Sequence, residues 1–325
     1  ARRVLRFHDG TVNALAALSG ECFASGGEDG RIAVWCGEGV RPQHVLTGHR
    51  GPIAALARSS NGRLLASASW DRQVRLWQLD TPPTSLRVIE GHAGPVNAVA
   101  FTPDGTAVVT AGYDGQVRLT AVDVGRAPLS RQFAVPLNAA VIAPDGQIVT
   151  AGADGRVQAL GLDLATTAET ALEHGPLTAL ALSPDGRTVA VTGLRTPVSL
   201  IERDGLRVRA QILGPGLPAW ALAFGVAGSG LLFTGGADGA VRGWDAATGK
   251  PAGIDVSPAT SSVGVRDSDR GAQVYRACRA CHGLTAADTN RAGPTFHGLF
   301  GRRIATAPGY DYSQALRSMD IVWTP

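Results

Sequence analysis

Short runs of alternating apolar and polar residues fill most of the chain, and turns interrupt them at regular intervals. Runs such as 64–67 and 98–101 follow a period of two, which is the period of a strand with one buried face. Pro-Asp-Gly triplets at 103–105, 144–146 and 184–186 separate runs of this kind, and these residues favour tight turns. The pattern predicts many short strands over residues 1–247.

These runs belong to a repeat of about 42 residues. A small-residue turn recurs at intervals of 42, 43, 40, 41 and 43 residues, at Asp29, Asp71, Asp114, Asp154, Arg195 and Asp238. Six positions after each turn stand Trp35, Trp77, Thr120, Leu160, Ile201 and Trp244, and histidines recur upstream at His8, His49, His92 and His174. Four short strands in each unit predict the blades of a β-propeller.

The second repeat, residues 48–77, resembles the WD-repeat family almost position by position. In that family a histidine, a serine, the turn aspartate and the strand tryptophan form a hydrogen-bonded tetrad. The resemblance gives these roles to His49, Ser67 or Ser69, Asp71 and Trp77. Buried imidazole and indole groups both need partners, and a carboxylate supplies an acceptor.

The number of blades is open at this point. Six repeats are visible, yet residues 2–7 precede the first histidine and resemble the outer strand of another blade. Either this strand completes the sixth blade, or it is the last strand of a seventh blade. We favour the second alternative, because the chain reads as a piece of a longer protein at both ends.

Composition narrows the partners that the chain can have. Of 325 residues, 44% are apolar, and no apolar run approaches the roughly 18 residues that span a bilayer. The net charge of +3 lies in the tail, since residues 266–325 hold eight Arg against five Asp. This excess is too small for a nucleic-acid footprint, so we expect neither nucleic acid nor a membrane span in this fragment.

Two of the four cysteines, Cys22 and Cys36, lie symmetrically about the turn at Asp29. We expect two small buried hydrophobic side chains, with a disulfide as the alternative, because pairs on adjacent strands often have poor disulfide geometry.

The pattern changes after residue 247. Residues 248–266 are rich in Pro, Ser, Thr and Gly and are typical of a linker. In the following segment, 267–325, Ser268 or Asp269 can cap a helix. Val274, Cys278 and Cys281 are then spaced three or four residues apart, which predicts one face of that helix.

This helix would lead into a C-x-x-C-H motif, Cys278 to His282. The two thiols can form thioethers with the vinyl groups of a haem, and the adjacent imidazole can ligate its iron. A zinc half-site would need a second ligand pair at matching spacing, and a thioredoxin-like pair would need a βαβ context. The motif therefore predicts one covalent haem c, with His282 as the iron ligand.

The segments 271–278 and 293–302 resemble class I, mitochondrial-like c-type cytochromes. The resemblance implies a small all-α cytochrome c domain after the all-β propeller, incomplete at its C-terminus. It implies that the carbonyl of Pro294 accepts the proximal imidazole N–H. It also implies haem propionate contacts from Arg302, Tyr312 and Trp323. The sixth iron ligand of the family is absent from this chain, since Met319, the one methionine, lies four residues before Trp323.

Taken together, the chain resembles bacterial WD-repeat proteins fused to a c-type cytochrome. The resemblance implies a haem-binding electron carrier rather than a catalyst, in the periplasm, where such haems are attached. A redox partner protein would dock on the propeller or the haem edge. Two alternatives stay open: a propeller-based redox enzyme with a second cofactor, and an interaction scaffold without redox function.

Overall fold

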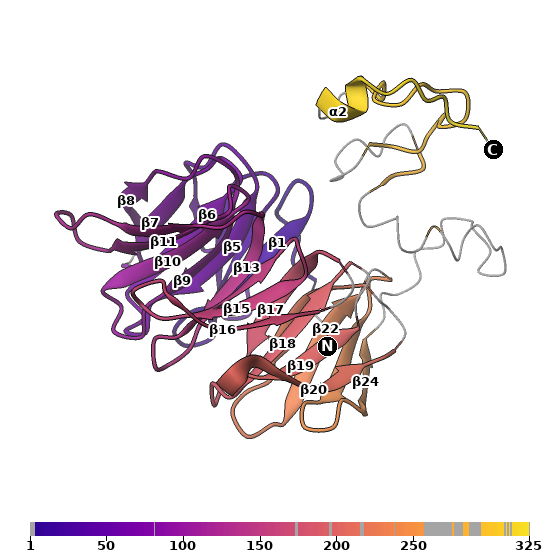
Figure 1. Cartoon of the computed structure of the whole chain (residues 1–325). Helices are drawn as coiled ribbons and strands as arrows, with labels where there is room; N and C mark the ends of the chain where they lie inside the picture. The colour runs from indigo at the N-terminus through magenta and orange to yellow at the C-terminus, as the bar shows by residue number, and fades with distance from the viewer. Residues whose placement is uncertain are drawn as a thin grey trace. The chain divides into compact units, whose positions relative to one another are not determined.

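The computed structural model describes most of the repeat region and parts of the tail (Figure 1). The described residues are 4–80, 82–172, 175–194, 197–214, 218–236, 238–256, 275, 282–285, 294–308, 310, 312 and 314–324. The chain divides into two compact units, of which the first holds Ala1–Gly236 and Val241–Val256 and the second holds Ala237–Ala240 and Ser257–Pro325.

The first unit is built from six four-stranded antiparallel sheets, and each sheet uses four consecutive strands. Blade one has β1 (Val12–Ala17), β2 (Cys22–Gly27), β3 (Ile32–Cys36) and β4 (His44–Leu46). Blade two has β5 (Ile53–Arg58), β6 (Leu64–Ser69), β7 (Val74–Gln78) and β8 (Thr84–Ile89). Blade three has β9 (Val96–Phe101), β10 (Ala107–Gly112), β11 (Gln116–Ala121) and β12 (Leu129–Gln132).

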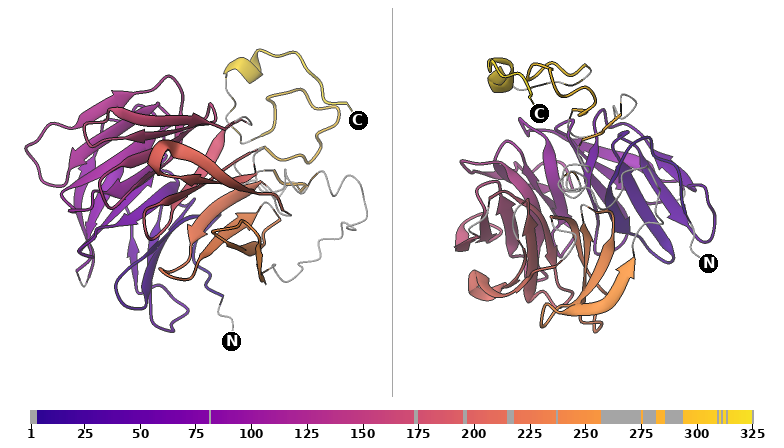
Figure 2. Two further views of the ribbon diagram at one scale, coloured as in Figure 1. Left: turned by 60° about the horizontal axis from the view of Figure 1, so that its bottom comes forward. Right: turned by 90° about the vertical axis from the view of Figure 1, so that its right-hand side faces the viewer.

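The later blades repeat this order. Blade four has β13 (Leu137–Ile142), β14 (Ile148–Gly152), β15 (Arg156–Leu160) and β16 (Thr166–Ala171). Blade five has β17 (Leu177–Leu182), β18 (Thr188–Gly193), β19 (Val198–Glu202), the 3-10 turn η1 (Asp204–Leu206) and β20 (Arg207–Ile212). Blade six has β21 (Ala219–Phe224), β22 (Leu231–Gly236), β23 (Val241–Asp245) and β24 (Pro251–Val256). Figure 2 shows the sheets following one another in chain order.

Apolar side chains hold neighbouring blades together. The first strands of consecutive blades pack against one another from β1 and β5 through to β17 and β21. One buried apolar cluster lies at each of these five junctions. In blade two the whole of β6 is buried, because its two faces meet different neighbouring blades. The core is therefore distributed between blades, as expected when stacked repeats bury one another's faces.

The turn between the second and third strands needs a left-handed residue in most blades. Gly30, Gly115, Gly155 and Gly239 all have positive φ there, and in blade two the same place is taken by Arg72 with φ 72°. A side chain in this conformation costs about 1 kcal/mol relative to glycine. The turn aspartate offsets part of that cost, because the carboxylate of Asp71 accepts the N–H of Gln73 at 3.0 Å.

The propeller is confirmed, but the expected all-α domain is wrong. Among the described residues after Val256, Tyr275 is helical and α2 (Gln314–Arg317) is a helix of four residues. The other regular pairing there is a single antiparallel bridge between Arg303 and Val322. Pro294 and Pro308 interrupt helical hydrogen bonding. The left-handed Gly298 and Gly301 also favour turns over helix.

Two other expectations can be compared with the structure. β24 fills the outermost place of blade six, so the alternative in which residues 2–7 complete that blade is wrong. Cys22 and Cys36 are joined by a disulfide instead of being separate hydrophobic residues. They lie directly opposite on β2 and β3 with Cα atoms 4.2 Å apart, the close approach of a non-hydrogen-bonded antiparallel pair. No described helix is long and apolar enough to cross a membrane.

Candidate functional site

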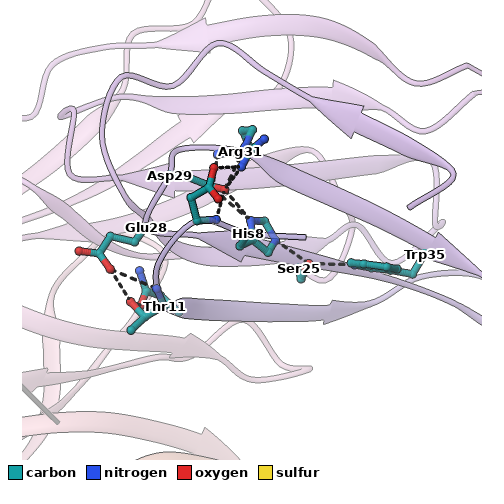
Figure 3. Close-up of polar contacts among 9 residues, drawn as sticks. His8, Thr11, Ser25, Glu28, Asp29, Arg31 and Trp35 are labelled. Carbon is teal, nitrogen blue, oxygen red and sulfur yellow. Dashed lines mark hydrogen bonds and ion pairs between the residues drawn. The ribbon is translucent and has the colours of Figure 1, made fainter. Parts of the chain in front are cut away.

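Two groups of polar side chains are candidates for function: the networks repeated in the blades and the segment around His282. Figure 3 shows the network of blade one. The imidazole of His8 contacts the Asp29 carboxylate through Nδ1 at 3.0 Å and the Ser25 hydroxyl through Nε2 at 2.8 Å. The indole Nε1 of Trp35 donates to the same hydroxyl at 2.9 Å. The four groups thus form one continuous chain of hydrogen bonds.

Blade two has the same series of hydrogen bonds, which shows whether Ser67 or Ser69 belongs to the tetrad. His49 contacts Asp71 at 2.8 Å and Ser67 at 2.8 Å, and Trp77 donates to Ser67 at 2.9 Å. The hydroxyl of Ser69 instead donates to the carbonyl of Gly51. The tetrad that the WD resemblance implied is therefore His49, Ser67, Asp71 and Trp77.

Burial determines the charge of the blade-two tetrad. Desolvation lowers the pKa of His49 below its ordinary 6.5, and the opposing pull of Asp71 does not cancel this effect. Burial alone would raise the pKa of Asp71, but hydrogen bonds from Arg50, His49 and Gln73 lower it below 3.8. At neutral pH a neutral imidazole therefore donates through Nδ1 to an ionised carboxylate. Its Nε2 is then left to accept from the hydroxyl of Ser67.

The network is reduced in the later blades. In blade three His92 contacts Asp114 and Thr110, but Thr120 replaces the tryptophan. In blade six the tryptophan Trp244 still donates to Thr234 at 2.9 Å. His174, the fourth recurring histidine, lies outside the described residues. Because the tetrads are buried between strands and their polar groups bond to one another, they stabilise the blades and offer no open reactive group.

The segment around His282 is organised differently. The Nδ1 atom of His282 lies 2.7 Å from the carbonyl oxygen of Pro294. One face of the imidazole stacks on Phe296, with ring centroids 4.2 Å apart and planes inclined by 14°. The hydroxyl of Tyr275 donates to the His282 carbonyl at 2.6 Å. Side chain and backbone of this histidine are thus both held in place.

The contact with Pro294 assigns the protons of the imidazole. A carbonyl oxygen only accepts hydrogen bonds, so Nδ1 of His282 carries the proton. In the neutral ring, Nε2 is then the nitrogen with a free lone pair, which is the form that binds metals. Hydrogen bonding at the other ring nitrogen is the usual arrangement behind a metal-bound histidine. The sequence predicted this contact with the Pro294 carbonyl. That the contact orients a histidine bound to iron stays a prediction.

A loop of residues 294–302 folds against residues 282–285 and keeps Pro294 in position. The N–H of Phe296 donates to the Gly283 carbonyl at 2.8 Å. The hydroxyl of Thr295 lies within 3.2 Å of the carbonyls of Gly283 and Thr285. Arg302 closes the loop, because its two terminal nitrogens donate to the carbonyls of Thr295 and His297 at 2.7 and 3.0 Å.

The remaining predicted site residues are distributed around this loop. Trp323 exchanges two backbone hydrogen bonds with Gly301 and Arg302, and its side chain is partly exposed. Tyr312 packs edge to face against Tyr310 at 4.9 Å. Cys278 and Cys281 lie outside the described residues. The expected propionate contacts of Arg302, Tyr312 and Trp323 stay predictions.

The residues present fit a haem iron at His282, with one oriented imidazole, an aromatic ring against it and an Nε2 atom that has no hydrogen-bond partner among the described residues. No cluster of three or more His, Cys, Asp or Glu that could hold a metal ion occurs among the described residues. Sequence reasoning assigned no role to Tyr275, Thr295 or Phe296. Their positions in the sequence could have indicated a role in the site. Thr295 and Phe296 directly follow Pro294, and Tyr275 lies seven residues before His282.

Comparisons with known proteins find two kinds of likeness. A family model described as "WD domain, G-beta repeat" matches residues 2–36, 40–78 and 83–120. "Cytochrome c2" of Blastochloris viridis is 38% identical over 69 residues, 21% of this chain and 51% of that protein. "Cytochrome c" of Arabidopsis thaliana is 40% identical over 58 residues, 18% of this chain and 52% of that protein.

A third relative is not named as a cytochrome. "Periodic tryptophan protein 2 homolog" of Mus musculus is 44% identical over 62 residues, 19% of this chain and 7% of that protein. The chain thus spans about half the length of the cytochromes that it matches, and a small part of this last relative. With the six sheets and the tetrads, these matches show that the chain carries WD40 repeats folded as a six-bladed β-propeller, together with a partial likeness to cytochromes c.

Proposed function

We propose that this protein binds one covalent c-type haem through Cys278, Cys281 and His282 and transfers electrons, with the propeller as the scaffold that docks its redox partner. The observation that carries the proposal is the 2.7 Å contact between His282 Nδ1 and the Pro294 carbonyl. This contact leaves Nε2 free in a chain whose sequence places two thiols three positions apart directly before it. The partial likeness to cytochromes c supports the same assignment.

In this proposal the chain holds and tunes the iron rather than reacting itself. Haem supplies one-electron exchange between two iron oxidation states. The Pro294 carbonyl, by accepting the Nδ1 proton, raises the donor strength of Nε2 and fixes the ring orientation. Arg302 maintains that carbonyl's position by tying the 294–302 loop together. Tyr312 and Trp323 are the proposed donors to the haem propionates, and a sixth ligand comes from outside this chain.

We place this activity in the periplasm. Thioether attachment at C-x-x-C-H takes place outside the cytoplasm in bacteria, and the Cys22–Cys36 disulfide adds an independent observation. Disulfides of this structural kind persist in oxidising compartments. The proposed partner is a protein with a redox centre, since the WD40 propeller offers a large surface and its polar tetrads are used within the blades.

The test is covalent haem loading in a host that has the c-type maturation system. The pyridine haemochrome spectrum of the denatured and washed protein should show one thioether-linked haem per chain. The Cys278→Ala, Cys281→Ala double variant should lose it. A full-length protein without covalent haem would refute the electron-transfer proposal and leave an interaction scaffold. A second haem or bound copper in metal analysis would instead support a redox enzyme.

Two single variants separate ligation from attachment. His282→Ala should lose the Soret and α bands of a histidine-bound haem, whereas His297→Ala should keep them. His297 is the matched control because it lies in the same segment and its imidazole is exposed. Identical spectra for both variants would show that His282 is not the ligand.

A further inference from the structure

The junction between blade six and blade one differs from the other five junctions. Consecutive blades elsewhere pack through their first strands and share a buried apolar cluster. Among the described residues, β21 and β1 show neither feature. The two blades therefore each present a face that lacks the neighbour found at every other position.

The first residue of each blade shows the difference on the blade-one side. In blades two to six this residue is at most 1% exposed, as Ile53, Val96, Leu137, Leu177 and Ala219. Its equivalent in blade one, Val12, is 53% exposed. Leu15, three residues further along β1, is also exposed. An apolar position that is buried in five blades and exposed in one indicates a missing partner rather than a surface position.

Blade six presents the complementary face. The first apolar residue of the third strand is at most 1% exposed in blades one to five, as Ile32, Val74, Val117, Val157 and Val198. Its equivalent in blade six, Val241, is 42% exposed. Val256, which pairs with Val241 from β24, is exposed as well, whereas the equivalent Ile212 of blade five is buried.

A buried donor on β21 supports the same conclusion. Asn97 and Asn138, each the second residue of a first strand, donate to the carbonyls of Leu137 and Leu177, which begin the next blade. Trp220 occupies this place in blade six, and its buried Nε1 has no partner among the described residues. A buried N–H without an acceptor is destabilising, and a further first strand would supply the carbonyl.

The start of the chain carries one strand of such a sheet. Residues 3–5 read Arg-Val-Leu three positions before His8, and residues 87–89 of β8 read Arg-Val-Ile three positions before His92. In blade two this segment pairs with β7 as the outermost strand. Val4–Phe7 form no strand in the structure, and the corresponding place in blade six is already taken by β24.

We propose that the faces of blades six and one are a docking surface for one further four-stranded antiparallel sheet. Val4 and Leu5 belong to the outermost strand of that sheet, and polypeptide outside residues 1–325 supplies the other three strands. The incoming sheet carries a branched apolar residue at the start of its first strand, to cover the blade-six face at Val241. Its other face covers Val12 and Leu15.

The test adds the missing strands to the chain, in the strand register that blade two already has. A second copy of residues 49–84 placed directly before Ala1 adds the first three strands of blade two with a complete tetrad. This junction puts Leu5 where Ile89 lies in the original blade. The readout is the rate at which a maleimide labels Val241→Cys in the folded protein, with Cys278 and Cys281 replaced by alanine. Val74→Cys is the control at an intact junction.

Labelling of Val241→Cys should be fast in the unextended chain and at least about tenfold slower in the extended one, because a buried thiol reacts only through local opening. An extended chain in which the added copy carries Ile53→Asp should label fast again. Fast labelling in every extended chain would overturn the proposal. Slow labelling in an unextended monomer would show that the ring closes on itself, and slow labelling in a dimer would show that a second copy covers the face.

Discussion

Blade two and blade four have the same four-stranded architecture but bury different groups at the same positions. Blade two holds His49, Asp71, Ser67 and Trp77 in one hydrogen-bonded chain. Blade four keeps the turn aspartate, but Leu160 replaces the tryptophan and is fully buried. The hydroxyl of Thr150, at the serine position, is buried and has no hydrogen-bond partner in the part of the chain that the structure describes. The comparison teaches that the tetrad is one solution for filling a blade, and that apolar packing is another.

The largest difference is expected at the turn aspartates. Asp71→Ala removes the acceptor of a buried imidazole and of the N–H groups of Arg50 and Gln73. Unsatisfied buried donors of this kind should cost about 3 kcal/mol of unfolding free energy. Asp154→Ala should cost about 1 kcal/mol or less, because its carboxylate is partly exposed and accepts the Arg156 N–H. Urea unfolding monitored by circular dichroism measures the unfolding free energy of both variants. Equal losses would contradict the difference expected between blade two and blade four.

Acid should destabilise the blades that contain histidine. Burial lowers the pKa values of His49 and His92 below 6.5 in the folded protein. The unfolded chain therefore binds protons more readily, and stability should fall as the pH drops below about 6.5, by at most about 1.4 kcal/mol per pH unit for each histidine. The lowered pKa of Asp71 adds a second loss below 3.8.

Melting temperatures of two variants show whether His49 causes the pH dependence of stability. His49→Gln should reduce the slope between pH 6.5 and 5, whereas His297→Gln, at an exposed position, should leave it unchanged. A wild-type melting temperature that is constant over this range would contradict the neutral buried imidazole.

Replacing the buried threonine by valine should affect stability differently in blades four and three. Thr150→Val in blade four removes a buried hydroxyl that has no partner, so stability should stay constant or rise by up to about 1 kcal/mol. Thr110→Val in blade three removes the partner of His92 Nε2, which lies 2.8 Å away, and should cost about 1–3 kcal/mol. Thermal unfolding of both variants is the measurement, and losses of the same size would show that Thr150 has an unrecognised partner.

The smallest effect is expected for Ser67→Thr. Blades three and six already carry threonine at this position, and Thr234 accepts from Trp244 at the same 2.9 Å that joins Ser67 to Trp77. The change should cost less than about 1 kcal/mol, as volume changes in a core that keeps its hydrogen bonds do. Ser67→Ala should cost about 2 kcal/mol, because it leaves the imidazole and the indole unpaired. A larger loss for threonine than for alanine would contradict this order.

The propeller could be predicted from the sequence because its signals are local and repeated. The spacing of Asp29, Asp71 and Asp114 fixes the blade length. An inner-strand residue such as Ile53 is buried for the same reason in blades two to six. β24 lies within residues 248–266, for which the richness in Pro, Ser, Thr and Gly predicts a linker. Only pairing with β23 makes it a strand.

In the tail, the contact between His282 and Pro294 could be predicted, but the architecture could not. The contact between His282 and Pro294 depends on two short segments and was expected. The all-α domain was an extension of family likeness to residues whose own composition favours turns, around Pro308 and Gly301. Arg302 was expected at a propionate, yet in the structure it bonds to carbonyls of its own loop, a partner that sequence spacing does not reveal.

The disulfide of blade one also decides how the chain distributes its thiols during biogenesis. The four cysteines could form three different sets of two bridges. Cys22 and Cys36 are only 14 residues apart and are aligned by a single hairpin, so they can be paired as soon as that hairpin forms. Cys278 and Cys281 are then the two thiols left over, hundreds of residues later in synthesis. A crosslink aligned within one hairpin thus leaves Cys278 and Cys281 outside the bridge, as the proposed haem attachment requires.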